Sequence, residues 1–300
     1  MGLLHEGTLL SPQGGGDFIM AVKTTHSPEL IKEFQGLAKQ LRIDVIELIH
    51  CRGQGHPGGS LSPAEIMSAL FFHQLNIDPK RLDWENRDRF ILSKGHACSI
   101  LYAALARRGF FPIEEYQSGG CIGSCLQGHP DRLKTPGVEM TTGCLGHGIN
   151  IGAGLCLAGK IRGLDYRTYV LIGDGECQAG IIWEGAMLAA KYKLSRLTAI
   201  LDNNGVQLDG RVADIMPLEP LKQKWEAFNW AVIEINGHNM AEVLSALDKS
   251  CEIKDKPTVI IANTIKGKGV SFMEGKSAWH GRAPNEEEYK QAIEELSRNG

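Results

Sequence analysis

The chain has 300 residues, with 32 Lys and Arg against 35 Asp and Glu, and a formal net charge of −3. A charge this close to neutral disfavours bulk nucleic-acid binding, which relies on a basic field, and a polybasic membrane-surface role. The eight cysteines are dispersed and form no CxxC pair, which favours a reducing compartment. No apolar run has the ~20 residues that cross a bilayer. We therefore expect a soluble cytoplasmic protein without nucleic-acid or membrane partners.

The N-terminal third predicts a tail followed by helices. Residues 1–26 include the run Gly14–Gly16 and are expected to form a flexible tail, ahead of one domain over 27–300. Ser27–Pro28 provides a helix start, and apolar residues at helical spacing predict a helix over 29–49. Ser62, with Pro63 next and Glu65 three residues on, matches a capping box and predicts a second helix over 62–75.

The rest of the chain alternates strand and helix patterns. A short strand over 89–93 leads into a helix over 97–108. Apolar runs at 169–172 and 197–201, joined by a helical pattern over 181–192, form a parallel βαβ unit. Strands over 231–235 and 258–262, a helix over 241–249 and a polar helix over 286–296 follow. We predict an α/β fold, a single domain whose mainly parallel sheet is covered by helices on both faces.

Two successive strands of this unit end in polar clusters. Gly173-Asp174-Gly175 follows the first strand and Asp202-Asn203-Asn204 follows the second. Ligands of open α/β sheets bind at the carboxyl ends of the strands. A carboxylate and an amide oxygen suit Mg²⁺, which completes its shell with phosphate oxygens and water. The residues thus favour a metal–diphosphate site over the alternative of two ordinary turns.

The GDG…NN spacing resembles the thiamine diphosphate motif, and the chain from about Gly55 to Pro284 resembles the N-terminal, diphosphate-binding half of the transketolase family. The histidine segments, in this order, carry the specific resemblance to transketolase. The matching segments are Gly55-His56-Pro57-Gly58, Ser93-Lys94-Gly95-His96, Gly128-His129-Pro130, Thr141-Thr142-Gly143-Cys144-Leu145-Gly146, the GDG and NN pair, and His280-Gly281-Arg282-Ala283-Pro284.

The resemblance implies thiamine diphosphate and Mg²⁺ as cofactors, with Ca²⁺ or Mn²⁺ able to substitute. It implies Asp174, Asn204 and the main-chain oxygen of Val206 as metal ligands. Gly143 and Leu145 would lie beside the cofactor's rings. The full set of cofactor-binding residues implied is His96, Gly143, Leu145, Gly173, Asp174, Gly175, Glu176, Asn204 and His280.

The same resemblance implies catalytic roles for histidines. His56, His129 and His280 would line the channel to the reactive carbon of the cofactor, and His96, which would contact the diphosphate, is also counted among the catalytic residues. Imidazole titrates near neutrality and can take or return the hydroxyl protons that ketol transfer moves. His5, His26, His50, His73 and His238 are expected to be ordinary surface or core residues, although His238 follows a strand and could lie near the site. The role of His147 stays open.

Some positions depart from the family pattern. Cys144 stands where transketolases usually carry Pro, and Ala179 stands where a Glu usually helps to couple two cofactor sites. Glu184 is the better placed of the nearby acids. Cys121 and Cys125, with His129, form a weak zinc pattern, because a fourth ligand is missing.

A full transketolase has about twice this length, and no segment here resembles its second half. The chain is therefore similar to the N-terminal subunit of a split transketolase. It would transfer a two-carbon ketol unit from a ketose or ketose phosphate to an aldose, in an α2β2 assembly with a separate C-terminal subunit. The alternatives are half of another thiamine diphosphate enzyme, of the 1-deoxyxylulose-5-phosphate synthase or E1 type, and a non-catalytic cofactor-binding regulatory subunit.

Overall fold

Five parallel strands form the centre of the computed structural model, which describes residues 26–298. The sheet has the order β1-β2-β3-β5-β4, and each neighbouring pair is parallel. The predicted tail, residues 1–26, lies outside the described residues except for His26. The strands are β1 (Arg89–Leu92), β2 (Thr168–Gly173), β3 (Leu197–Asn203), β4 (Ala231–Asn236) and β5 (Thr258–Asn263).

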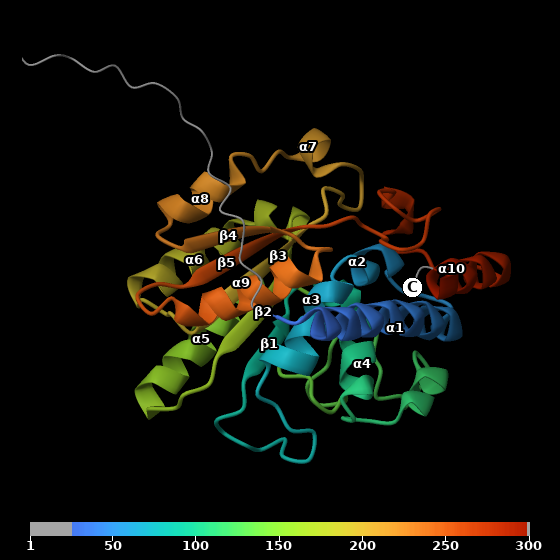
Figure 1. The fold of residues 1–300 in the computed structure, drawn as a ribbon, viewed down its shortest axis with the longest axis horizontal. Helices are drawn as coiled ribbons and strands as arrows, with labels where there is room; N and C mark the ends of the chain where they lie inside the picture. The colour runs from blue at the N-terminus through green and yellow to red at the C-terminus, as the bar shows by residue number, and fades with distance from the viewer. Residues whose placement is uncertain (1–25, 299–300) are drawn as a thin grey trace, which may run out of the picture.

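Both faces of the sheet are covered by helices, as the sequence predicts (Figure 1). Side chains alternate along a strand, so Tyr169 and Leu171 pack on one face of β2 while Val170 and Ile172 pack on the other. The first face carries α1 (Pro28–Arg52), α2 (Pro57–Leu61), α3 (Ala64–Ala69), α4 (Cys98–Arg107) and α9 (Met240–Glu252). The second carries α5 (His147–Arg162), α6 (Gly180–Lys191) and α8 (Leu221–Ala227).

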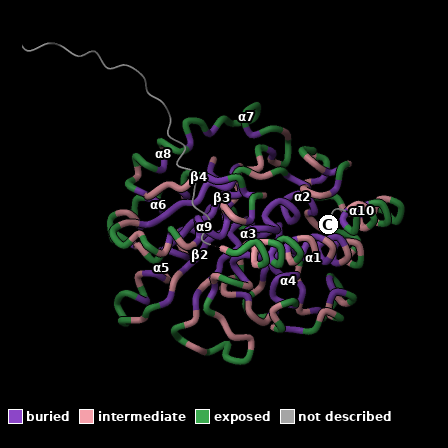
Figure 2. Tube along the Cα trace, viewed as in Figure 1, coloured by how far each residue is buried: buried purple, intermediate pink, exposed green. Residues whose placement is uncertain are grey.

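Strands β1, β2, β3 and β5 are largely buried, as are α2 and α3, whereas the edge strand β4 is only partly buried. The outer surfaces of helices such as α1 and α10 are exposed (Figure 2). At the periphery, α10 (Glu286–Arg298) packs along α1, while α7 (Val212–Ile215) is a single turn. Short 3₁₀ turns are η2 (Gly95–Ala97), η3 (Ile113–Ser118), η4 (Gly175–Gln178) and η5 (Ser277–Trp279). Within residues 26–298, no helix is both long and apolar enough to cross a membrane.

The start of α1 confirms the predicted cap. Ser27 precedes Pro28 at the first helical position, and its Oγ accepts a hydrogen bond from the amide of Leu30 at 3.2 Å. Ser27 thus satisfies one of the amides that a helix start leaves unpaired. The other predicted strands and helices agree with the structure to within a few residues at each end.

The predicted helix over 62–75 is wrong in its start and its regularity. The chain forms α2, then α3, then the π-helical turn η1 (Leu70–Gln74). Ser62 does not cap α3, because its Oγ donates instead to Asp202 at 2.6 Å. Glu65 bonds to Arg42 at 2.6 Å rather than reaching back to the helix start. Tertiary partners have replaced both halves of the capping box.

Helix α5 has no counterpart among the predicted elements. Its glycines lower helix propensity, yet they let it lie close against the sheet. A Cβ on Gly152 would lie 2.6 Å from Cγ2 of Val170, and one on Gly148 would lie 2.3 Å from Oγ of Ser93. These glycines are required for close helix–sheet packing, which sequence periodicity alone does not reveal.

Candidate active site

A pocket of about 290 Å³ opens at the carboxyl ends of the strands. Asp174 follows β2 and Asn204 follows β3, and these two strands are neighbours in the sheet. The topology thus brings the two predicted polar clusters together. The pocket is lined by Gly59, Lys94, His96, Leu145, Gly173, Asp174, Gly175, Glu176, Gln178, Asn204, Val206, Gln207, Leu208, Lys266 and His280.

Asp174 is buried and faces this pocket. One carboxylate oxygen accepts from the amide of Gly175 at 2.7 Å, and the other accepts from the amide of Gly205 at 2.5 Å. Burial, helped by the charge of Asp202, raises the pKa of Asp174 to about 6. The buried carboxylate is therefore poorly compensated within the chain, and a cation in the pocket would stabilise its charged form.

Asp202 lies beside Asp174 but is fully paired. It accepts from Oγ of Ser62 at 2.6 Å and from Nδ2 of Asn204 at 3.1 Å, and it also accepts from Thr264 and from the buried ammonium of Lys94. Burial would raise the pKa of Asp202, but Lys94 and these hydrogen bonds outweigh it and lower the pKa. Asp202 therefore supports the site as an ionised residue.

The loop after β3 carries the other two predicted metal ligands. Asn204 Oδ1 accepts from the amide of Val206 at 3.1 Å. The carbonyl of Val206 accepts from Nζ of Lys266 at 3.1 Å, and Lys266 also donates to Nδ1 of His280 at 3.0 Å. Lys266 is buried, and burial and the nearby Lys94 lower its pKa to about 8. Sequence reasoning missed Lys266 and the role of Lys94, because a lysine pattern alone does not distinguish a buried ammonium from a surface one.

Glu176 connects the segments around the pocket. Its carboxylate accepts from the amides of Gly146 at 2.6 Å and Gly173 at 3.0 Å, and from Oγ of Ser93. These contacts join the end of β1, the end of β2 and the loop that leads into α5. The structure gives Glu176 a positioning role in the pocket wall, and a direct contact with a cofactor stays a prediction.

The structure brings the predicted histidines together. The ring centroid of His56 lies 5.3 Å from that of His96, 5.6 Å from that of His280 and 6.3 Å from that of His129. The rings of His96 and His280 stack at 4.9 Å. They come from four separate segments: the start of α2, η2, the turn after η5 and the loop before α5.

These imidazoles are held in their neutral form. Burial and then Lys266 lower the pKa of His280 to about 3, and burial and then Lys94 lower that of His96 well below its usual value. Burial also lowers the pKa of His56 and of His129, with Arg52 adding to the effect at His129. A neutral imidazole presents one nitrogen that accepts a proton and one that donates.

The loop before α5 places Leu145 on the pocket wall and Gly143 against His129, where a Cβ would lie 3.4 Å from Cδ2 of the imidazole. His147 is exposed, and its Nδ1 lies 3.3 Å from the carbonyl of Leu145. Cys144 is exposed in the same loop. Glu184 is exposed on α6, beyond Ala179.

The remaining described histidines have other partners. His26 pairs with Asp248 at 2.8 Å, and its ring contacts that of His73 edge-on. His50 stacks on Tyr289. His238 lies behind the pocket, bonded to Glu65 and to the amide of Ile265. His5 falls outside the described residues.

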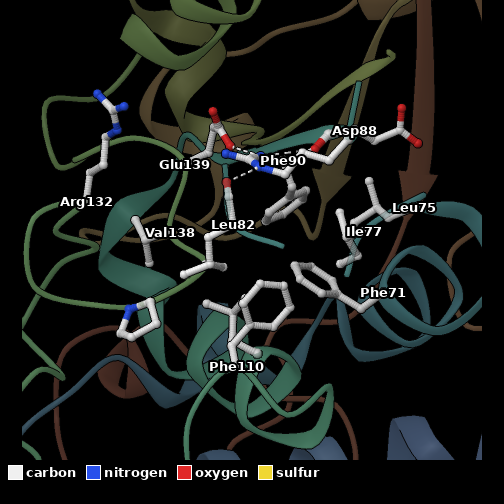
Figure 3. A pocket seen from close by; sticks show the side chains of 14 residues that line it. Phe71, Leu75, Ile77, Leu82, Asp88, Phe90, Phe110, Arg132, Val138 and Glu139 are labelled. Atoms are coloured by element: carbon white, nitrogen blue, oxygen red, sulfur yellow. Dashed lines mark hydrogen bonds and ion pairs between the residues drawn. The ribbon is translucent and has the colours of Figure 1, made fainter. Parts of the chain in front are cut away.

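A second pocket, of about 210 Å³, opens near the amino end of β1. Figure 3 shows its mainly apolar lining, with Phe71, Phe90 and Phe110 around the cavity and Glu139 at one side. None of the predicted site residues lines it. Of the predicted site residues, those that line a pocket are found in the pocket at the opposite end of the sheet.

A parallel α/β sheet with a buried carboxylate, an amide, two lysines and a histidine cluster at its carboxyl edge is typical of an α/β enzyme domain that binds its ligand at the strand ends. The comparisons with known proteins narrow this class. Residues 34–299 match the family model described as "Transketolase, thiamine diphosphate binding domain". The chain belongs to this transketolase family.

Several relatives of matching length are named as transketolase subunits. The chain is 45% identical to the 6-deoxy-6-sulfo-D-fructose transketolase subunit of a Clostridium species, over 89% of this chain and 98% of that one. It is 41% identical to one subunit of the apulose-4-phosphate transketolase of Phocaeicola vulgatus, over 84% of this chain and 90% of that one. The crystal structure of a Pichia stipitis transketolase superposes with a TM-score of 0.84 at 29% identity, over 88% of this chain and 40% of that one.

Proposed function

We propose that this chain is the N-terminal subunit of a thiamine diphosphate- and Mg²⁺-dependent transketolase. It transfers a two-carbon ketol unit from a ketose donor to an aldose acceptor together with a separate C-terminal subunit. The observation that carries the proposal is the buried, poorly compensated carboxylate of Asp174, which faces a pocket that His96 and His280 also line.

The residues of the pocket fit a metal–diphosphate group. The donor set of Asp174, Asn204 and the Val206 carbonyl is composed of oxygens, which Mg²⁺ prefers. The lack of a side chain at Gly175 leaves space beside Asp174, because a Cβ at Gly175 would lie only 3.1 Å from Cβ of Gln207. The ammonium group of Lys266 supplies positive charge for a diphosphate in the same pocket, while that of Lys94 is paired with Asp202. Ca²⁺ or Mn²⁺ would be bound by the same oxygens.

When bound, the cofactor supplies the electron sink for cleaving and forming the carbon–carbon bond. The chain's own residues hold and move protons. Neutral His56 and His129 can each accept a proton from a substrate hydroxyl at one ring nitrogen and return it later. His96 and His280, stacked side by side, both line the pocket and would contact a bound diphosphate. Glu176 keeps the loop with Gly143 and Leu145 in place.

Apolar side chains at the pocket support a partner subunit. Leu208 and Leu145 line the pocket and are 61% and 42% exposed, and Met216, whose carbonyl accepts from the lining residue Gln178, is also exposed. Large exposed apolar residues gathered at a site mark an interaction surface. Two of the relatives are named as transketolase subunits, and we propose an α2β2 assembly with sites at the interfaces between unlike subunits.

The substrates proposed are sugars or sugar phosphates of the kind transketolases use. The relatives are named for a sulfonated fructose and for apulose 4-phosphate. Pentose phosphates, branched-sugar phosphates and sulfonated sugars are all compatible with this subunit, and a role in carbohydrate metabolism follows. The proposed location is the cytoplasm, which agrees with eight free thiols.

The test is thiamine diphosphate binding by calorimetry with and without Mg²⁺, on the chain isolated with its partner subunit. A ketol-transfer assay with ketose and aldose phosphates follows. We expect Mg²⁺-dependent binding and product formation that needs both subunits. Binding without turnover in the complete complex would favour a non-catalytic regulatory subunit instead.

A further inference from the structure

The segment after β5 places Lys266 in the pocket, and three of its backbone amides donate hydrogen bonds to other parts of the chain. The amide of Thr264 donates to the carbonyl of Asn203 at 3.1 Å, and that of Gly267 donates to the carbonyl of Gly58 at 2.9 Å. Between them, the amide of Ile265 donates to Nε2 of His238 at 2.8 Å. The amide directly before Lys266 is thus held by a side chain rather than by the main chain.

His238 is itself fixed by a buried ion pair. Its Nδ1 lies 3.1 Å from Oε2 of Glu65, and the same oxygen accepts from Nη2 of Arg42 at 2.6 Å. Because Nε2 accepts from the Ile265 amide, the ring hydrogen lies on Nδ1 and points at Glu65. The network sets both the tautomer and the orientation of the imidazole. It links α1, α3 and the turn before α9 to the segment that carries Lys266.

We propose that His238 is a positioning residue that sets the place of the Lys266 ammonium through the Ile265 amide. Lys266 reaches the carbonyl of Val206 at 3.1 Å and Nδ1 of His280 at 3.0 Å. A shift of the adjoining peptide would therefore move the ammonium relative to a predicted metal ligand and a predicted catalytic imidazole. The consequence for cofactor binding rests on the function proposed above, whereas the mechanical role of His238 does not.

Two amide variants separate the roles of the two ring nitrogens, because each keeps a polar atom near the place of one nitrogen only. In His238→Gln, the side-chain oxygen takes the place of Nε2 and can still accept from the Ile265 amide. In His238→Asn, the side-chain amide takes the place of Nδ1 and can still donate to Glu65, but the Ile265 amide loses its acceptor. Both variants lose the ring, so a general packing defect would affect them alike. The matched control is His50→Asn, which removes from α1 a ring that stacks on Tyr289 of α10.

The first readout is hydrogen exchange of the segment 263–270 in the chain isolated with its partner subunit. We expect faster exchange in His238→Asn, and near-wild-type exchange in His238→Gln and His50→Asn. The second readout is thiamine diphosphate affinity with Mg²⁺. Removing the acceptor of the Ile265 amide should weaken this affinity about tenfold in His238→Asn, with little change in His238→Gln and a smaller effect on turnover at saturating cofactor.

Equal exchange and equal affinity in the two His238 variants would overturn the proposal, because the acceptor at Nε2 would then not matter. A wild-type complex that fails to bind thiamine diphosphate would instead contradict the proposed function. The exchange difference between His238→Asn and His238→Gln would still decide the positioning role in that case. Urea unfolding of each variant checks that both are folded.

Discussion

The pKa values of two neighbouring carboxylates at the sheet edge are shifted in opposite directions. Asp202 is ionised because Lys94, Ser62 and Thr264 outweigh its burial, while burial and the charge of Asp202 raise the pKa of Asp174 to about 6. Asp174, not Asp202, lines the pocket. The chain therefore leaves its uncompensated negative charge on the residue that faces the ligand.

Replacing Asp174 tests this assignment. Asp174→Asn should weaken Mg²⁺-dependent thiamine diphosphate binding by about hundredfold or more, since even residues behind a metal's ligands are worth 10–100-fold. The free energy of unfolding should change little, because removal of a buried charge is offset when one of the amides of Gly175 and Gly205 loses its acceptor. Calorimetry and urea unfolding measure the two effects, with the exposed Asp209→Asn as control. Unchanged affinity in Asp174→Asn would contradict the metal assignment.

His129 lies in the loop before α5 and contributes to the histidine cluster, with part of the residue open to solvent. His129→Ala should lower turnover by about a hundredfold, the usual scale of general acid–base catalysis. Cofactor affinity should change much less. Steady-state kinetics at saturating cofactor measure the effect, with the exposed His147→Ala as control. Equal turnover in wild type and His129→Ala would remove His129 from the substrate channel.

Glu65 predicts a pH dependence of stability. Burial would raise its pKa, but Arg42 and then His238 outweigh burial and lower it from 4.5 to about 2. A lowered acid pKa stabilises the fold fully above pH 4.5, and this stabilisation is lost as the pH falls from 4.5 toward 2. Glu65→Gln should lower the free energy of unfolding at pH 7 by roughly 3 kcal/mol, because it leaves Arg42 buried without its charge partner.

Urea unfolding of wild type and Glu65→Gln at pH 7 and at pH 3 measures this dependence. The difference between the two proteins should shrink at the lower pH. A gap of the same size at both pH values would show that the loss comes from packing rather than from the charge of Glu65.

At the scale of elements, α5 depends on one glycine and tolerates change at another. A Cβ on Gly152 would lie 2.6 Å from Val170, whereas one on Gly154 would meet nothing within 4 Å. Gly152→Ala should destabilise the fold by about 1–3 kcal/mol through overpacking. Gly154→Ala should stabilise it by up to about 1 kcal/mol through helix propensity. Denaturant unfolding of the two variants measures both changes in stability. Equal changes for Gly152→Ala and Gly154→Ala would contradict the packing described for α5.

The strands and most helices follow from local patterns, because buried strands and amphipathic helices have distinct periods. Two failures have physical causes. Ser62 and Glu65 match a capping box, but Asp202, Arg42 and His238 offer stronger tertiary partners. Helix α5 is not predicted by helix propensity because it contains several glycines, and these glycines allow it to pack closely on β2.

The candidate site was predictable where chemistry follows strand ends or motifs. The clustering of His56, His96, His129 and His280 agrees with the resemblance to transketolase. The buried partners of the site were not predictable in this way. Lys94, Lys266 and the His238 contact depend on which distant segments the fold brings together, and no local pattern marks them.

At the scale of the whole molecule, the chain matches nearly the full length of relatives named as transketolase subunits, but 40% of a Pichia stipitis transketolase chain. The pocket is rimmed by exposed apolar residues such as Leu208. Both facts agree with a site that a second chain completes. We therefore expect the functional unit to contain this chain and a C-terminal-type chain around thiamine diphosphate.

Native mass spectrometry of the protein isolated gently from its own cells tests this expectation most directly. We predict an assembly with two copies of this chain, two copies of a second chain that resembles the C-terminal part of transketolase, and two bound thiamine diphosphates. A chain that is isolated alone, or only with itself, and without cofactor would contradict it.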